Sequence, residues 1–243
     1  MPIEMTSSER MRQVEIDTGG TTRLLSQLTA PLALDDLTPS TGPWEVEIGF
    51  GKGRYLVGRA QNEPQRRFLG IEVARSYFHL ATQRAARRSL SNLVLIRGEA
   101  LFVIAALLPA GFARAVHVYF PDPWPKARHH RRRLFDPETV DLVLGLLVPG
   151  GELYFATDFI EYGELVAELL ASHPGCRIER LTGGWPEGAR TNYEAKYLGQ
   201  GRGILRLAVG WQPPSPTQTL HPLGARGIVA ATGSRVELAS PTP

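Results

Sequence analysis

Residues 116–133 read Val-His-Val-Tyr-Phe-Pro-Asp-Pro-Trp-Pro-Lys-Ala-Arg-His-His-Arg-Arg-Arg. The first five are mostly β-branched or aromatic, a composition typical of a buried strand, and we interpret His117 as a core residue. Three prolines end this strand because each fixes φ and lacks a backbone donor. A residue before a proline is driven out of the helical region, so Asp122 and Trp124 are predicted to lie on a stiff, extended loop.

A cluster of cations follows the prolines. It comprises Lys126, Arg128, Arg131, Arg132 and Arg133, with two histidines among them. Such a patch attracts phosphates more strongly than the net charge of +3 suggests. We therefore predict that these side chains bind a polyanion, with Asp122 and Trp124 held beside them. A second run, Arg84–Arg88, fits either a solvated helix face or a phosphate contact.

The composition indicates a soluble α/β protein. With 243 residues, 43% of them hydrophobic, the chain can form one domain of ordinary size or two small ones. Cys176 is the only cysteine, which excludes an internal disulfide and a thiolate zinc cluster, and we expect no metal. We find no charged-then-apolar leader and no run of about 18 apolar residues, so we expect a cytoplasmic protein with no membrane contact. The sequence leaves open whether it is a monomer or a homodimer.

Short apolar runs alternate with amphipathic ones between residues 44 and 211. Strands are predicted at 44–48, 67–73, 93–96, 115–120, 152–156, 177–181 and 203–211, and helices at 54–61, 74–89, 100–108, 137–147 and 159–172. This alternation predicts an α/β fold with a mostly parallel seven-stranded sheet and helices on both faces. Residues 1–43 are expected to form a loosely attached arm, and residues 212–243 a tail of linker composition.

Acidic residues recur where the predicted strands end. Glu47 lies within the first strand, and Glu72, Glu99, Asp122 and Asp158 end or follow later strands. Because ligands bind outside the carboxyl ends of parallel strands, these carboxylates are predicted to line one functional edge. Asp158 also fits the N-cap of the helix that follows it.

The first strand leads into a glycine-rich turn, Glu47-Ile48-Gly49-Phe50-Gly51-Lys52-Gly53. Its spacing departs from the dinucleotide-binding pattern, and a negative Glu47 would repel a pyrophosphate. Glu47 suits instead a cationic cofactor such as S-adenosylmethionine. Glu72 is placed to accept hydrogen bonds from ribose hydroxyls, and Glu99 to meet an adenine amino group.

Pro-Asp-Pro-Trp-Pro-Lys, followed by His-His-Arg-Arg-Arg, resembles the signature of bacterial tRNA (guanine-N7-)-methyltransferases. Glu47-Ile-Gly-Phe-Gly-Lys-Gly, Gly70-Ile-Glu-Val and Ala156-Thr-Asp158 support the resemblance, which covers roughly residues 44–211. It implies a Rossmann-like methyltransferase fold with S-adenosylmethionine as methyl donor. It also implies tRNA as substrate, with the methyl group added to N7 of the guanosine at position 46 of the variable loop.

The resemblance also implies roles for particular residues. Cofactor contacts map to Glu47, Gly49, Gly51, Glu72 and Glu99, and Asp122 is both close to the cofactor and catalytic. Substrate contacts map to Lys126, Asp158, Thr191, Asn192, Tyr193 and Glu194, with phosphates held by Arg128, Arg131, Arg132 and Arg133. Asn192 stands where the family usually has lysine, so one substrate contact is expected to differ.

Two other interpretations remain open from the sequence. Asp-Pro-Trp-Pro is loosely similar to a motif of exocyclic amine methyltransferases, although its prolines are placed differently. Asn192, Glu99 and the unusual arm would also fit a catalytically weak tRNA-binding protein. The presence of Glu47, Glu72 and Asp122 favours an active enzyme.

Overall fold

The computed structural model describes residues 14–18, 21–24 and 31–213. The strands are β1 (Glu15–Thr18), β2 (Thr21–Leu24), β3 (Trp44–Ile48), β4 (Arg67–Glu72), β5 (Leu93–Arg97), β6 (Ala113–Tyr119), β7 (Leu147–Thr157), β8 (Cys176–Arg180) and β9 (Leu205–Trp211). The helices are α2 (Arg54–Asn62), α3 (Arg75–Arg87), α4 (Ala100–Leu107), α5 (Val140–Leu144), α6 (Ile160–Ser172) and α7 (Asn192–Gly199), with 3-10 turns η2 (Leu34–Leu37) and η3 (Ala127–Arg132).

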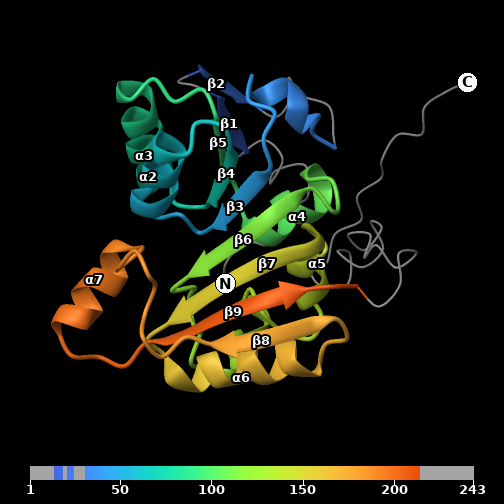
Figure 1. Cartoon of the computed structure of the whole chain (residues 1–243), viewed down its shortest axis with the longest axis vertical. Coiled ribbons are helices and arrows are strands. Elements are labelled where there is room, and N and C mark those ends of the chain that lie inside the picture. Colours follow the sequence, from blue (N-terminus) through green and yellow to red (C-terminus); the bar gives the residue numbers. More distant parts are fainter. Residues whose placement is uncertain (1–13, 19–20, 25–30, 214–243) are drawn as a thin grey trace, which may run out of the picture.

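The strands form one sheet in the order β2-β1-β5-β4-β3-β6-β7-β9-β8 (Figure 1). The five central strands run parallel to one another. β9 lies antiparallel between β7 and β8, and β1 and β2 add antiparallel at the opposite edge. All seven strands expected between residues 44 and 211 are present, so the predicted α/β fold is confirmed, with two further strands before them.

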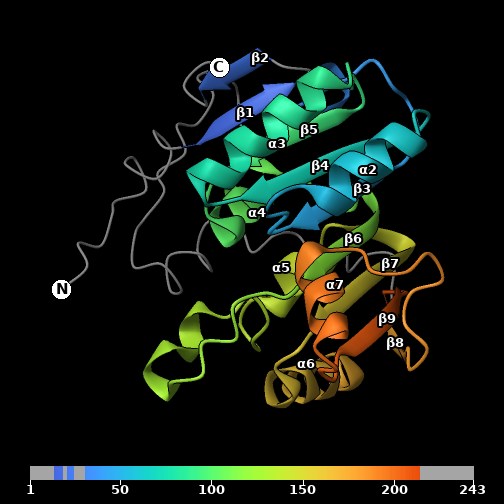
Figure 2. The ribbon, with the colours of Figure 1, turned by 90° about the vertical axis from the view of Figure 1, so that its left-hand side faces the viewer.

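Helices cover both faces of the sheet: α2 and α3 lie on one side, and α4, α5 and α6 on the other (Figures 1 and 2). Successive strand residues point to opposite faces, so neighbours in β4 serve different cores. Phe68 packs with Phe78 of α3, whereas Leu69 belongs to the larger cluster that includes Phe102 of α4. No helix in the described part of the chain is long and apolar enough to cross a bilayer.

Part of the expected N-terminal arm belongs to the sheet. Ile16 in β1 pairs with Ile96 in β5, and Val14 and Ile16 are each only 1% exposed. Glu15 also forms an ion pair with Arg97 at 2.7 Å. The expectation of loose attachment is therefore wrong for residues 14–18, whose alternating apolar pattern suits a strand. Residues 214–243 of the predicted tail lie outside the described residues.

Three local expectations are also wrong. α5 is shorter than the predicted helix: a turn in which the Asp136 carboxylate accepts hydrogen bonds from the backbone of Glu138 and Thr139 leads into it, and β7 already begins at Leu147. β7 begins at Leu147, five residues before the strand predicted at 152–156, so the Pro-Gly-Gly segment at 149–151 lies within it. Finally, α7 lies between the strands predicted at 177–181 and 203–211, where no helix was predicted.

Candidate active site

The carboxyl ends of the parallel strands meet at one edge of the sheet, beside α7 and the segment that contains η3 (Figure 2). The predicted acidic residues are distributed along this edge. Glu47 lies in β3, and Glu72 is the last residue of β4. Glu99, Asp122 and Asp158 follow β5, β6 and β7. The five carboxylates expected along one edge therefore come from five adjacent strands.

Glu72 fastens the glycine loop to the end of β4. Its Oε2 accepts a hydrogen bond from the backbone N–H of Gly51, and its Oε1 accepts one from Ala74, both at 2.8 Å. Gly49 and Gly51 have φ angles of 76° and 53°, in the left-handed region that favours glycine. A Cβ built at either position meets no atom within 4 Å. The loop therefore presents bare backbone to open space beside an anchored carboxylate.

Glu47 is a buried acid with an uncompensated oxygen. Its side chain is 2% exposed, and its Oε2 has no hydrogen-bond partner among the described residues. Burial raises the pKa of Glu47 to about 8, because removing the carboxylate from water disfavours its charged form; the nearby Glu72 charge acts in the same direction. A cationic group placed against this oxygen would reverse that penalty.

Glu99 caps α4. Its two carboxylate oxygens accept hydrogen bonds from the backbone N–H groups of Leu101 and Phe102, at 3.0 and 2.9 Å. A carboxylate at a helix N-terminus is favoured by both these bonds and the helix dipole. Each oxygen has a second lone pair, so the cap leaves the side chain able to accept a further hydrogen bond.

The loop after β6 is turned more sharply than the sequence predicts. Phe120 and Trp124 have positive φ angles of 53° and 42°, so Trp124 is not extended as expected. Its ring packs against the Arg132 guanidinium at 5.0 Å and edge-on to His129 at 5.7 Å, so Trp124 helps to pack the loop. Asp122 between these turns is exposed, with no hydrogen bond or ion pair to the described residues.

The cations after the prolines fall into two groups. Lys126, Arg128 and Arg132 are exposed. Arg133 is only 7% exposed; its Nε donates to the Pro123 carbonyl at 2.8 Å, and its guanidinium lies over the Tyr162 ring. Arg133 thus holds the loop in place, and the expectation that it faces a phosphate is wrong. The side chain of Arg131 lies outside the described part of the structure.

The predicted substrate segment, residues 191–194, begins α7. Thr191 is its N-cap and accepts a hydrogen bond from the Glu194 backbone at 3.0 Å. Glu194 is 1% exposed: its Oε1 pairs with Arg206 at 2.7 Å, and its Oε2 accepts from the Arg190 backbone at 2.8 Å. Glu194 therefore connects the start of α7 to β9 and does not present a free carboxylate at the surface.

The other two residues of this segment face neighbouring elements. Tyr193 is 48% exposed, lies against Phe120 and exchanges a side-chain hydrogen bond with Tyr77 of α3. The hydrogen bond with Tyr77 is the largest of the causes that raise the pKa of Tyr193, and the Asp122 charge acts in the same direction. Asn192 accepts a hydrogen bond from Arg54 at the start of α2. α7 thus spans from the glycine-loop helix to the loop that carries Asp122.

Asp158 does not cap the helix that follows it. Phe159 occupies the N-cap position of α6 without a side-chain cap, and its N–H bonds to Thr157. Asp158 instead pairs with Arg202, just beyond α7, at 3.1 Å. The alternative interpretation of Asp158 as an N-cap is therefore wrong, and its carboxylate ties the end of β7 to the α7 segment.

A partly buried arginine that sequence analysis missed, Arg190, links the start of α7 to the sheet. The Arg190 guanidinium lies 3.9 Å from the centroid of the Trp185 ring, with Tyr55, Tyr119 and Tyr154 at 4.9–5.7 Å. It also pairs with Glu187 at 2.6 Å. This cage combines ion pairing with cation–π attraction. Its aromatic residues are far apart in the chain, so no local pattern could reveal it.

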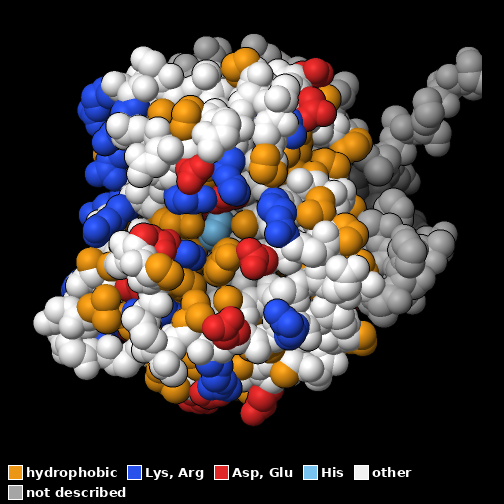
Figure 3. Space-filling view, in the orientation of Figure 1, with side chains coloured by type: hydrophobic (Ala, Val, Ile, Leu, Met, Phe, Trp, Pro, Cys, Tyr) orange, Lys and Arg blue, Asp and Glu red, His pale blue; other side chains and the backbone are white. Residues whose placement is uncertain are grey.

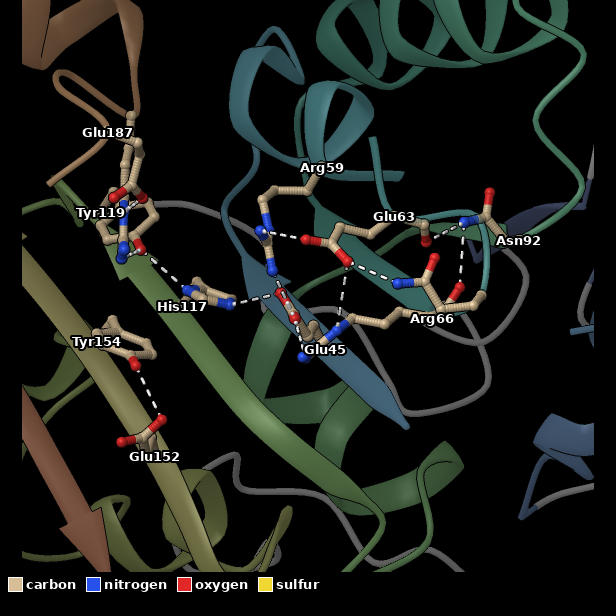
Figure 4. Close-up of polar contacts among 12 residues, drawn as sticks. Glu45, Arg59, Glu63, Arg66, Asn92, His117, Tyr119, Glu152, Tyr154 and Glu187 are labelled. Atoms are coloured by element: carbon tan, nitrogen blue, oxygen red, sulfur yellow. Dashed lines mark hydrogen bonds and ion pairs between the residues drawn. The ribbon is translucent and has the colours of Figure 1, made fainter. Parts of the chain in front are cut away.

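The cage continues into the sheet through a chain of hydrogen bonds (Figure 4). Arg190 donates to the Tyr119 hydroxyl at 2.6 Å, which lies 2.9 Å from Nδ1 of His117. Nε2 of His117 lies 3.3 Å from Glu45. Burial lowers the pKa of His117, so the neutral ring accepts from Tyr119 and donates to Glu45. His117 is a core residue, as predicted.

Most of the chain, including this edge of the sheet, is similar in sequence to known methyltransferases. A family model described as "Putative methyltransferase" matches residues 41–207. A tRNA (guanine-N(7)-)-methyltransferase of Nitrosococcus oceani is 38% identical over 179 residues, covering 74% of this chain and 76% of the relative. The chain belongs to the tRNA (guanine-N7-)-methyltransferase family. A relative of the same name in Treponema pallidum is 40% identical, covering 68% of this chain and 66% of that protein.

Solved structures support the fold that this family assignment implies. The 16S rRNA methyltransferase KamB superposes with a TM-score of 0.59 at 16% identity, covering 82% of this chain and 100% of that chain. A 30S ribosomal A1408 methyltransferase from an uncultured bacterium superposes with a TM-score of 0.55 at 14% identity, covering 82% of this chain and 100% of that chain. At these identities the likeness shows the fold alone. This member of the tRNA (guanine-N7-)-methyltransferase family has the Rossmann-like methyltransferase fold predicted from its sequence.

Proposed function

We propose that the protein transfers a methyl group from S-adenosylmethionine to N7 of guanosine in tRNA, at position 46 of the variable loop. The proposal depends on one observation: at this edge of the sheet, a chain of this family combines a bare glycine loop, a buried Glu47 with one oxygen unpartnered among the described residues, and an exposed Asp122. The enzyme acts on cytoplasmic tRNA, as a monomer or homodimer, without a metal.

The residues at the glycine loop fit S-adenosylmethionine. Open space above Gly49 and Gly51 admits a ligand against the backbone. The unpartnered Glu47 oxygen suits the cofactor's positive charge. Glu72 and Glu99 retain lone pairs for ribose hydroxyls and an adenine amino group. When bound, S-adenosylmethionine supplies an electrophilic methyl group.

The acceptor chemistry needs positioning more than proton transfer. Guanine N7 carries a lone pair and no proton, so no general base is required. Asp122 and Asp158 are carboxylates that can accept hydrogen bonds from guanine N1–H and the 2-amino group, and they favour the positive charge that develops on the imidazole ring. Tyr193, half exposed beside Asp122, offers an aromatic face to a base turned out of its stack. Glu194 contributes by bracing α7.

The backbone of the tRNA needs cations near the acceptor base. Lys126, Arg128 and Arg132 are exposed on and beside η3, and we assign phosphate contacts to them together with Arg131. Thr191 and Asn192 at the start of α7 contact the nucleotide from the other side. Asn192, already bonded to Arg54, contributes an amide where the family usually has a charge.

Two measurements test this function. Calorimetry with S-adenosylmethionine should show binding by the wild-type protein. A tRNA transcript incubated with the protein and S-adenosylmethionine should yield N7-methylguanosine when its nucleosides are analysed by mass spectrometry. An exocyclic methylamine would replace the proposed acceptor with the alternative one. Binding of tRNA without any methylated nucleoside would instead indicate the catalytically weak tRNA-binding protein.

A further inference from the structure

Six cations away from the Asp122 loop gather on and between α2 and α3. We call this set the α2–α3 basic surface; it consists of Lys52, Arg54, Arg75, Arg84, Arg87 and Arg88. Lys and Arg side chains line the margin of the molecule where these helices lie (Figure 3). The Arg84 side chain donates to the Lys52 carbonyl, and Arg88 donates to the Arg84 carbonyl at 3.1 Å, so part of the set is mutually ordered.

The α2–α3 basic surface lacks neutralising acids. Among the described residues, none of its six members forms an ion pair, whereas arginines elsewhere do so repeatedly: Arg59, Arg66, Arg67, Arg97, Arg180, Arg190, Arg202 and Arg206. α2 and α3 themselves contain no Asp or Glu. Arg84 and Arg88 are one helical turn apart, where like charges repel. A solvated face normally intersperses both signs.

Helix stabilisation accounts for only part of this arrangement. Cations favour the C-terminus of a helix and are unfavourable at its N-terminus, where the dipole is positive. Arg54 is the first residue of α2 and Arg75 the first of α3, and neither helix has an acidic residue in its first turn. Arg84, Arg87 and the C-cap residue Arg88 lie at the end of α3 where the dipole favours cations, so helix stabilisation accounts for these three and not for Arg54 and Arg75. Positive charge therefore occurs at the N-termini of both helices against the helix dipole, as well as at the C-terminus of α3.

The surface starts at the proposed active site and extends away from it. Arg54 contacts Asn192 of α7, and Arg75 lies two residues from Tyr77, which bonds to Tyr193. From there the 13 residues of α3 extend about 20 Å at 1.5 Å per residue. α7 lies between this surface and the segment that contains η3 (Figure 2). The two cationic regions thus flank the acceptor site.

We propose that the α2–α3 basic surface binds the phosphate backbone of a double-helical arm of the same tRNA whose guanosine reaches the active site. This inference rests on the proposed function. The cations extend over about 20 Å along α3, with Arg75 at one end and Arg84, Arg87 and Arg88 at the other, so they can meet phosphates that are well separated on a duplex. Double-stranded RNA is recognised through its shape and backbone. The residues around η3 hold the strand with the acceptor base, and the α2–α3 basic surface fixes the orientation of the folded tRNA.

The test removes charge at the end of the surface far from the active site. Arg87→Gln/Arg88→Gln is compared with Arg114→Gln/Arg177→Gln, which removes the same charge from exposed arginines on β6 and β8. Binding of a tRNA transcript is measured against KCl concentration, together with kcat, KM for tRNA and S-adenosylmethionine affinity. Melting temperature checks folding, and Arg87→Lys/Arg88→Lys tests rescue by charge.

The glutamine variant should show a higher KM for tRNA, an unchanged kcat and a salt slope smaller by about 0.7–0.9 for each lost phosphate contact. The lysine variant should recover most of the affinity. A glutamine variant that binds tRNA like the wild type, or like the control variant, would overturn this inference alone. Wild-type protein that neither binds nor methylates tRNA would overturn the proposed function with it.

Discussion

At the scale of single residues, the proposed mechanism depends most on Asp122. This carboxylate is exposed beside Tyr193 and unpaired within the described residues, so it is available to a substrate. Asp122→Asn should lower kcat by about 100-fold or more, because a preorganised charge that stabilises the transition state is lost. The Kd for tRNA should change by no more than about threefold. Asp36→Asn, at an exposed position in η2, controls for lost charge, and retained kcat in the Asp122 variant would exclude Asp122 from catalysis.

The raised pKa of Glu47 predicts that cofactor affinity depends on pH. Burial raises the pKa of this acid to about 8, so below that pH it is protonated and must release its proton to face a cation. Affinity for S-adenosylmethionine should therefore rise with pH up to about 8, by at most about tenfold per pH unit for one proton. Calorimetry in two buffers of different ionisation enthalpy would detect the released proton. Glu47→Gln should lose both effects, and a pH-independent wild-type affinity would refute this assignment.

At the scale of elements, α7 depends on the buried pair of Glu194 and Arg206, which are 1% and 7% exposed. Glu194→Gln leaves the guanidinium without its counter-charge and should cost about 3 kcal/mol of unfolding free energy. Urea denaturation measures this loss. Glu164→Gln makes the same chemical change in an exposed pair with Arg180 and should have little effect. Equal stability of the two variants would contradict the bracing role of Glu194.

Some features of these elements can be predicted from the sequence, and others cannot. The glycine turn and the acids after each strand follow from local patterns and the rule for parallel sheets, and the structure places them as expected. α7 was missed, although Thr191 and Glu194 have the spacing of a capping box. Arg133 looked like its exposed neighbours because charge alone does not reveal burial. The Arg190 cage depends on tertiary contacts between distant segments, which no pattern within one element encodes.

At the scale of the whole molecule, two buried acids predict how stability varies with pH. Burial would raise the pKa of Glu45, but the hydrogen bonds that His117 and Arg59 donate to it, together with the Arg59 charge, lower it to about 2. Its contribution is present above about pH 4.5 and is lost as the pH falls toward 2. Glu47 acts oppositely. Its pKa is higher in the folded than in the unfolded state, so its protonated form stabilises the folded protein at low pH, and this contribution is lost as the pH rises from about 4.5 to 8.

Without cofactor, these two groups should therefore make the protein most stable near pH 4.5. Each should change the unfolding free energy by roughly 1 kcal/mol per pH unit within its window. Urea denaturation across pH 2–9 measures the profile. Glu45→Gln should flatten the acid side, and Glu47→Gln the alkaline side. A wild-type profile that neither variant alters would contradict both assignments.

The central claim is methyl transfer to one guanosine of tRNA. The most direct test supplies tritiated S-adenosylmethionine and an unmodified tRNA transcript, alongside a transcript that differs only in having adenosine at position 46. Label should enter the first transcript as N7-methylguanosine and be absent from the second. Equal labelling of both transcripts would contradict the proposed target, and cofactor binding without label in either would contradict tRNA as the acceptor.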